Sequence, residues 1–124
     1  MSPPRRVRAF RGATTVPADD PLLIAEATAE LVRELVSRNA LDPDDLVSAF
    51  FTVTPDLRSE FPARAARDVG WGDVPLLCTV EIPVAGALPR CIRVLVHAET
   101  TRDRDEVRHV YLRDARTLRP DLAE

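Results

Sequence analysis

Lysine is absent from this chain of 124 residues, and all 17 of its basic side chains are arginines. The simplest explanation is a genome rich in arginine codons, so the choice of arginine over lysine carries little information. The positions of the arginines carry more. The chain also lacks an excess of positive charge, since its formal net charge is −3, and this argues against a nucleic-acid-binding protein.

Cysteine and histidine are scarce, with two residues of each type. Cys78 and Cys91 are more consistent with free thiols than with a disulfide, because a chain that is not secreted meets a reducing environment. His97 and His109 have no cysteine or histidine at metal-ligand spacing, which argues against a zinc site. The stretch TRDRDE lacks the glycine and the final glutamate of a calcium loop. We therefore expect neither a metal nor a cofactor.

Long hydrophobic runs are missing as well. No stretch approaches the roughly 20 apolar residues that a membrane-spanning helix needs. The opening segment MSPPRRVRAFRG lacks the apolar core of a secretory signal, so we expect a cytoplasmic protein. The length predicts a single domain over residues 1–124, which can bury roughly two-thirds of the surface that the unfolded chain exposes.

Residues 20–39 have the pattern of one long helix. Asp20 suits the N-terminal cap, Pro21 suits the first helical position, and Asn39 suits the exit. The apolar positions form one stripe at helical spacing, namely Leu23, Ala27, Leu31, Val32, Leu35 and Val36. A single apolar stripe predicts a helix that covers a sheet.

Five segments have the pattern of strands: VRAFRGATT, LVSAFFTV (residues 46–53), VPLLCTVEI, CIRVLVHAE and EVRHVYL. LDPDD predicts a capped turn, FPARAARDV a short helix, and Trp71 lies in a predicted loop. The grouping predicts an α+β fold, in which one long helix and short helical turns cover one face of a mixed sheet of about five strands. The uncovered face is apolar and suits an oligomer interface.

Arg93 interrupts an apolar strand. Ile92, Val94 and Val96 alternate as half-buried strand residues do, and a permanent cation among them needs water or an anion. Polar residues interrupt or end other strands in a similar way, namely Arg11, Cys78, Glu81, Tyr111 and Arg119. Each of these alone is explained by a solvated side chain on an open strand face. Together, the three arginines and the glutamate could line one cleft for a dicarboxylate, because a guanidinium matches a carboxylate with two hydrogen bonds.

These segments resemble the AroH-class chorismate mutases, which are small α+β enzymes. The matching segments are RGATTV, TPDLRSEFPARAAR, GWGDVPLLCTVEIPVAGALPRCIRVLV and RHVYLRDARTLRPDL, in the family's order. They cover most of the chain after Phe10. The resemblance implies a homotrimer arranged as a trimeric pseudo-α/β barrel, with active sites at the subunit interfaces and chorismate as the substrate. The net charge and the lack of a long apolar run argue separately against a nucleic-acid or membrane partner.

The resemblance also implies roles for individual residues. Arg11 and Tyr111 correspond to groups that hold a substrate carboxylate, Arg93 to the arginine beside the ether oxygen, and Cys78 and Glu81 to groups that meet the ring hydroxyl. Arg93, Glu81 and Arg11 form the expected catalytic set. The other expected substrate-binding positions are Phe61, Ala63 and Arg64 on a loop from a neighbouring subunit, Arg67 and Arg119 at the mouth, and Leu118. The family has lysine at the position of Arg64.

The implied reaction is a Claisen-type rearrangement of chorismate to prephenate. It needs no proton transfer and no covalent intermediate, so the missing nucleophile–base pair is consistent with it. Two alternatives stay open. One is a trimeric imine or enamine deaminase of small α+β architecture, which also holds a carboxylate with an arginine. The other is a small-molecule sensor that binds a dicarboxylate without turnover.

Overall fold

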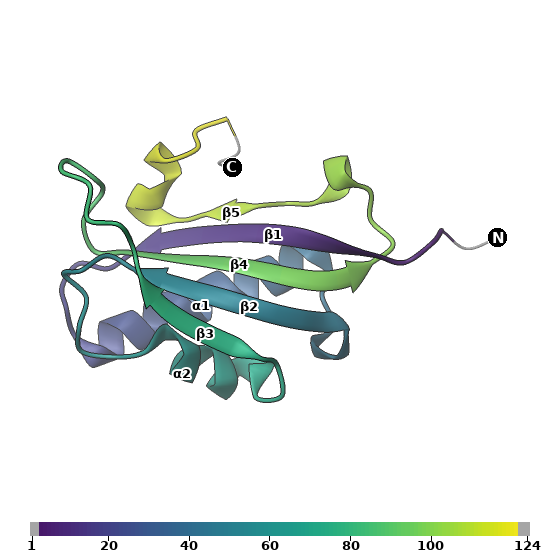
Figure 1. Ribbon diagram of the computed structural model, residues 1–124, viewed down its shortest axis with the longest axis horizontal. Coiled ribbons are helices and arrows are strands. Elements are labelled where there is room, and N and C mark those ends of the chain that lie inside the picture. Colours follow the sequence, from purple (N-terminus) through teal and green to yellow (C-terminus); the bar gives the residue numbers. More distant parts are fainter. Residues whose placement is uncertain (1–2, 122–124) are drawn as a thin grey trace.

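Five strands form one mixed sheet in the computed structural model, which describes residues 3–121 (Figure 1). The spatial order is β3-β2-β4-β1-β5. The strands are β1 (Arg6–Thr15), β2 (Leu46–Val53), β3 (Leu76–Val80), β4 (Cys91–Thr100) and β5 (Val110–Tyr111). β4 pairs antiparallel with β1 and β2, whereas β3 and β5 pair in parallel at the two edges. The predicted mixed sheet is therefore confirmed.

Both helices cover the same face of this sheet, as Figure 1 shows. They are α1 (Pro21–Asn39) and α2 (Pro62–Ala66), and the short helical turns are η1 (Pro43–Asp45), η2 (Arg67–Trp71), η3 (Arg104–Glu106) and η4 (Arg113–Thr117). The opposite face carries no helix among the described residues. The α+β class and the cover on one face agree with the sequence prediction. No helix in the described part of the chain is long and apolar enough to cross a membrane.

The ends of α1 are fixed by side chains that the sequence pattern identifies. The Asp20 carboxylate accepts hydrogen bonds from the backbone N–H groups of Leu22 (2.9 Å) and Leu23 (3.1 Å), which have no partner within the helix. The helix ends at Asn39, and Ala40 takes a left-handed conformation with φ of 50°. The Asn39 side chain is buried, and it bonds both the N–H and the C=O of Arg108 (2.8 and 2.7 Å). Asn39 thus ends the helix and anchors the segment that leads to β5.

Close contact between α1 and β1 depends on Gly12. A Cβ atom at this position would lie 3.0 Å from a methyl carbon of each of Leu31, Leu35 and Val94. The core between helices and sheet also contains Phe51 and Trp71, whose rings lie 6.3 Å apart and are both nearly inaccessible to water. Trp71, expected in a loop, closes η2, where Gly70 has φ of 114°.

The last strand is shorter than the sequence pattern predicted. The segment EVRHVYL was expected to form a strand throughout, but only Val110 and Tyr111 pair with β1. Glu106 belongs to the turn η3, and the backbone of Arg108 bonds the Asn39 side chain in place of a neighbouring strand. Alternating apolar residues predicted a strand here, but side-chain hydrogen bonds satisfy the backbone instead.

Candidate active site

β4 holds Arg93 on the face of the sheet that the helices leave open. Ile92, Val94 and Val96 point into the core, with exposed fractions of 0%, 3% and 0%. Successive side chains of a strand point to opposite faces, so Arg93 is directed away from the core, and its side chain is about half exposed. The alternation predicted from the sequence is confirmed.

Two rows of paired residues cross the open face and build a pocket. One row runs across four strands, from Thr52 to Arg93, Ala13 and Tyr111, and the next contains Phe50, Leu95 and Arg11. They line a cavity of about 330 Å³, which Glu81 also borders. We call this cavity the arginine pocket. Ala13 has the smallest side chain of its row, so it leaves space between Arg93 and Tyr111.

Glu81 and Thr52 orient the Arg93 guanidinium. Glu81 Oε1 lies 3.6 Å from Arg93 Nε and accepts a hydrogen bond of 2.6 Å from Thr52 Oγ1. The backbone N–H of Glu81 donates to the C=O of Val53 (2.8 Å), so pairing with β2 fixes the residue after β3 has ended. A half-exposed ion pair adds little to stability, and its main effect here is to fix the direction of the cation.

Arg11 brings a second cation to the arginine pocket, and Tyr111 brings a hydroxyl. In the part of the chain that the structure describes, the side chain of Arg11 has no hydrogen bond or ion pair with a protein group. Tyr111 is almost fully buried, with an exposed fraction of 6%. A cation without a protein anion beside a pocket is suited to bind an anionic ligand.

A second cavity of about 430 Å³ lies where the segment before α2 meets β3. We call it the α2–β3 pocket. It is lined by Phe61, which is 64% exposed, and by Arg64 and the exposed thiol of Cys78. Arg64 Nε lies 3.5 Å from Glu60 Oε1. The two pockets share no lining residue.

This arrangement separates Cys78 from Glu81, which the sequence comparison had expected at the same ligand group. Cys78 pairs with Phe51, a core residue, whereas Thr52 belongs to the opposite face. Neighbouring residues of paired strands point to the same side, so the side chain of Cys78 is directed away from the arginine pocket. Within one chain, Cys78 lies with Phe61 and Arg64 instead.

The segment that carries Phe61 is held in place by Asp19. One oxygen of the Asp19 carboxylate accepts hydrogen bonds from the Ser59 hydroxyl (2.7 Å) and from the backbone N–H groups of Arg58 (3.0 Å) and Ser59 (3.1 Å). The Ser59 hydroxyl is the main reason that the pKa of Asp19 lies below its ordinary value. These hydrogen bonds fix the backbone of the segment that leads to Phe61 and borders the α2–β3 pocket.

Comparisons with known proteins point to one family. The family model described as Chorismate mutase type I matches residues 7–122. The chain is 51% identical over 117 residues to Chorismate mutase AroH of Thermus thermophilus, covering 94% of this chain and 96% of the relative. It is 42% identical over 118 residues to Chorismate mutase AroH of Bacillus subtilis (strain 168), covering 94% and 93%. The solved structure of a chorismate mutase from Clostridium thermocellum matches with a TM-score of 0.87 and 44% identity, over 89% of this chain and 98% of that one.

The chain belongs to the type I chorismate mutases. The resemblance identified from the sequence is thus confirmed. The family match spans both pockets, since residues 7–122 include every lining residue discussed above.

Four other positions expected from the type I pattern line neither of the two pockets in the single chain, namely Leu118, Arg119, Ala63 and Arg67. Leu118 packs with Ala13, Tyr111 and Ala115 in a small apolar cluster. Arg119, which the resemblance places at the mouth of the site, is not among the residues that line the arginine pocket, and its guanidinium bonds the Asp121 carboxylate at 2.9 and 3.1 Å. This pairing raises the pKa of Arg119 and lowers that of Asp121.

Ala63 and Arg67 do not line either pocket themselves. Ala63 belongs to the core, with an exposed fraction of 4%, and is not among the residues that line the α2–β3 pocket. Arg67 is exposed at the start of η2 and borders neither pocket. Arg64, which stands where the type I family was expected to have lysine, keeps the positive charge at the pocket.

The pocket residues that the sequence analysis did not identify include Phe50, Thr52 and Leu95. The spacing of these residues within their strands could have identified them. Leu95 is two residues from Arg93 in β4, and Phe50 and Thr52 are two residues apart in β2. Residues two apart in a strand share a face. The cross-strand register that aligns the two strands with each other could not be read from either segment alone.

Cys91 lies at the start of β4 and is almost completely buried. Burial raises the pKa of its thiol, although the neighbouring Arg93 guanidinium acts in the opposite direction. A buried protonated thiol is a poor nucleophile, so the geometry gives Cys91 a packing role.

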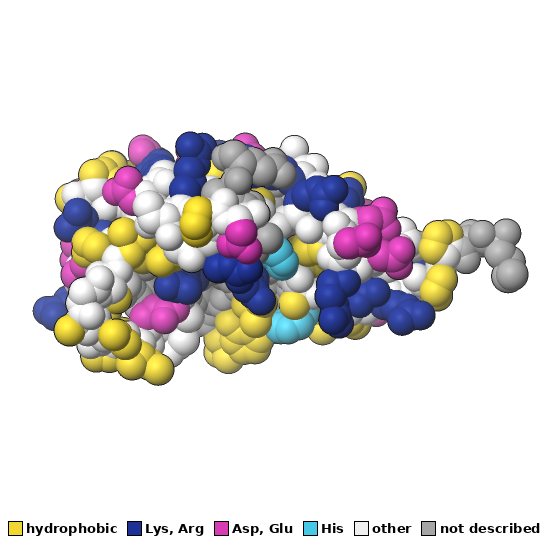
Figure 2. All heavy atoms as spheres, turned by 90° about the horizontal axis from the view of Figure 1, so that it is seen from above, with side chains coloured by type: hydrophobic (Ala, Val, Ile, Leu, Met, Phe, Trp, Pro, Cys, Tyr) yellow, Lys and Arg dark blue, Asp and Glu magenta, His cyan; other side chains and the backbone are white. Residues whose placement is uncertain are grey.

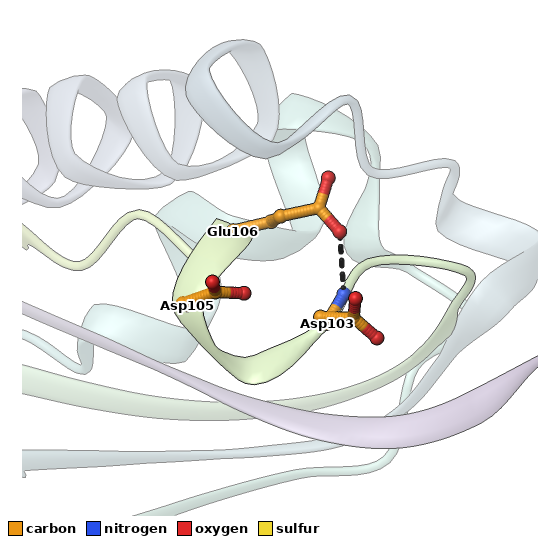
Figure 3. Close-up of side chains that lie close together, drawn as sticks. All are labelled: Asp103, Asp105 and Glu106. Atoms are coloured by element: carbon orange, nitrogen blue, oxygen red, sulfur yellow. Dashed lines mark hydrogen bonds between the residues drawn. The ribbon is translucent and has the colours of Figure 1, made fainter.

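Three carboxylates gather at η3, where Asp103, Asp105 and Glu106 place oxygen atoms within 4.8 Å of one another. Figure 3 shows that Glu106 reaches back to the backbone N–H of Asp103, at 2.9 Å. Together with the Asp103 side chain, this contact forms a capping box. All three residues are exposed. The cluster is explained by the capping of a turn.

Proposed function

We propose that this protein catalyses the rearrangement of chorismate to prephenate, a step in the biosynthesis of phenylalanine and tyrosine, in the arginine pocket. One observation carries the proposal beyond the family match. A guanidinium between apolar residues of β4 is held by Glu81 beside a second cation that has no anionic partner among the described residues. A substrate with two carboxylates and an ether oxygen fits this charge pattern.

The reaction suits a site without a nucleophile or a base. One carbon–oxygen bond breaks while one carbon–carbon bond forms, and no proton leaves the substrate. The protein must therefore hold the substrate folded and stabilise charge as it develops. Arg11 and Tyr111 would hold a carboxylate of the side chain over the ring, and this restriction removes entropy from the barrier.

Arg93 would supply the electrostatic contribution. As the carbon–oxygen bond lengthens, the ether oxygen gains partial negative charge, so a fixed guanidinium stabilises the transition state more than the neutral ether of the substrate. Losing one such preorganised donor costs on the order of 10²- to 10³-fold in kcat. Glu81 orients the Arg93 guanidinium through the 3.6 Å contact, and its carboxylate, which borders the same pocket, would accept a hydrogen bond from the ring hydroxyl.

A homotrimer with sites shared between subunits is the second part of the proposal. The support is that the two pockets share no residue within one chain, although the family pattern assigns both to one site. In addition, large apolar side chains are exposed on and after the edge strand β3, notably Leu77, Val80, Ile82 and Val84. A second chain could bury this surface and bring its Phe61, Arg64 and Cys78 to the arginine pocket. Three such sheets would form the trimeric pseudo-α/β barrel.

Within this assembly the remaining expected positions surround the substrate. Arg64 would add a third cation from the neighbouring subunit, Ala63 would support Phe61, and Leu118, Arg67 and Arg119 would lie at the mouth.

We also place the protein in the cytoplasm, where an exposed free thiol such as Cys78 stays reduced.

The test follows the ultraviolet absorbance of chorismate in the presence of wild type, Arg93→Ala and Arg93→Lys. We expect wild type to form prephenate, and we expect each variant to lose on the order of 10²-fold or more in kcat. Arg93→Lys is the sharper variant because it keeps the charge and loses the planar fork. The control is Arg33→Lys, at an exposed position on α1, which should leave turnover unchanged.

Two results would count against the proposal. Near-normal turnover by Arg93→Ala would remove Arg93 from the chemistry. Tight binding of chorismate by wild type without loss of absorbance would indicate a binding protein in place of an enzyme.

A further inference from the structure

His109 contacts the backbone of a pocket residue from outside the arginine pocket. It immediately precedes β5, and its Nδ1 accepts a hydrogen bond of 2.9 Å from the backbone N–H of Arg11. The pairing of β1 with β5 covers only Gly12–Val110 and Ala13–Tyr111. The His109 contact therefore extends a very short strand pair by one residue, at the residue whose side chain enters the pocket.

This contact requires a neutral imidazole. A ring nitrogen that accepts a hydrogen bond carries no proton, so the proton of neutral His109 is assigned to Nε2. A protonated ring donates from both nitrogens and cannot accept from Arg11. The bond between His109 and Arg11 is thus broken by one proton.

The charged groups nearest to His109 are mostly cationic, and one of them, Arg119, is itself paired with the Asp121 carboxylate. A cavity of about 460 Å³ next to the arginine pocket is lined by the charged or titratable residues Arg8, Arg11, His97, Arg104 and His109. No carboxylate among the described residues lines it. Figure 2 shows histidine side chains, in cyan, next to basic side chains, in dark blue, on this side of the molecule. The pKa of His109 is lowered first by burial and then by Arg11 and Arg119, which favours the neutral ring near neutral pH.

Arg11 borders both cavities. Its backbone N–H reaches the imidazole, and its guanidinium is available to a ligand in the arginine pocket. A proton on His109 would remove the acceptor of that N–H and add a positive charge next to the guanidinium. Both effects would displace Arg11 from the position at which it and Tyr111 face the same ligand group.

We propose that neutral His109 is a positioning residue that holds Arg11 for the substrate carboxylate, and that its protonation releases this grip. The proposal rests on the proposed function. It assigns the residue a role in substrate binding without any contact to the substrate.

The experiment measures kcat and KM for chorismate between pH 5 and 8 in wild type, His109→Asn, His109→Ala and the control His97→Asn. The amide oxygen of asparagine can accept from the Arg11 N–H but does not titrate in this range. We expect the wild-type KM to rise about fivefold or more toward pH 5, the effect of one lost hydrogen bond, with a smaller change in kcat.

The variants separate positioning from simple folding. His109→Asn should match the wild-type KM at pH 8 and should not show the rise in acid. His109→Ala should have a raised KM at every pH, and His97→Asn should keep the wild-type profile. A wild-type KM that is constant with pH, a His109→Asn profile that still rises in acid, or an unchanged KM in His109→Ala would each overturn the proposal.

A measurement without turnover distinguishes failure of this inference from failure of the proposed function. The chain has only two histidines, so NMR titration with His97→Asn as reference follows His109 alone. Its pKa should lie below 6.5 and should rise in Arg11→Ala. If wild type leaves chorismate unchanged, the proposed function fails; if the pKa of His109 does not respond to Arg11→Ala, the coupling proposed here fails.

Discussion

At the scale of single residues, the candidate site depends on partners that set the direction of a few charged groups. Arg93 is a permanent cation, but its direction depends on Glu81, and the position of Glu81 depends on the hydroxyl of Thr52. The contacts of 3.6 and 2.6 Å link β2 and β4 through the residue that follows β3. Removing the Thr52 hydroxyl tests whether the orientation of Arg93 affects catalysis separately from its charge.

Thr52→Val removes the hydroxyl and keeps the shape of the side chain. We expect kcat/KM for chorismate to fall about fivefold, because one hydrogen bond to the Glu81 carboxylate, of about 1 kcal/mol, is lost. The matched control is Thr101→Val at an exposed position beyond the end of β4, which should change neither rate nor stability. Equal kcat/KM in Thr52→Val and wild type would show that Glu81 orients Arg93 without the hydroxyl.

At the scale of elements, the distance between α1 and β1 fixes where the row of pocket residues lies. Gly12 sits directly opposite Leu31 and Leu35 of the helix, and its neighbours Arg11 and Ala13 face the arginine pocket. The absence of a side chain at Gly12 lets the helix pack closely on the sheet. This contact belongs to the core and is independent of ligand binding.

Gly12→Ala should therefore lower the free energy of unfolding by about 1–3 kcal/mol, the usual cost of overpacking. The added Cβ would lie 3.0 Å from three methyl carbons. Gly72→Ala is the matched control, because φ at Gly72 is −61° and no atom lies within 4 Å of the added Cβ. Its stability should stay the same or rise by up to about 1 kcal/mol. Urea unfolding of both variants measures the difference, and equal midpoints would contradict the packing argument.

At the scale of the whole molecule, the proposed active site needs more than one chain. The arginine pocket and the α2–β3 pocket are separate in each subunit. In the proposed trimer, every site takes Arg93 from one subunit and Arg64 from its neighbour. Such a division can be tested by mixing subunits with different defects.

Co-expression of Arg93→Ala and Arg64→Ala chains should restore activity that neither variant has alone. With random mixing of the two chains, about a quarter of the shared sites receive both intact halves. The assay is turnover of chorismate per site, with the mass of the assembly compared with that of the 13.8 kDa chain. The control mixes Arg93→Ala with Glu81→Ala, whose defects lie in the same pocket and cannot complement. Failure of the first mixture to recover would place the whole site within one chain.

Much of the fold could be predicted from local patterns. The cap at Asp20, the end of the helix at Asn39, the strand of residues 46–53 and the alternation around Arg93 all follow from periodicity and from the chemistry of neighbouring residues. The prediction failed at β5, where apolar alternation suggested seven strand residues. There the buried Asn39, distant in sequence, took the hydrogen bonds of the backbone.

The sequence by itself determined most of the elements, the face of β4 that carries Arg93 and the family. Only the tertiary structure decided which polar residues meet. It joined Thr52, Arg93, Ala13 and Tyr111 in one row, moved Cys78 to the other pocket and paired Arg119 with Asp121. The physical reason is that periodicity is a local property of the chain, whereas the order and register of strands depend on contacts between residues far apart in sequence.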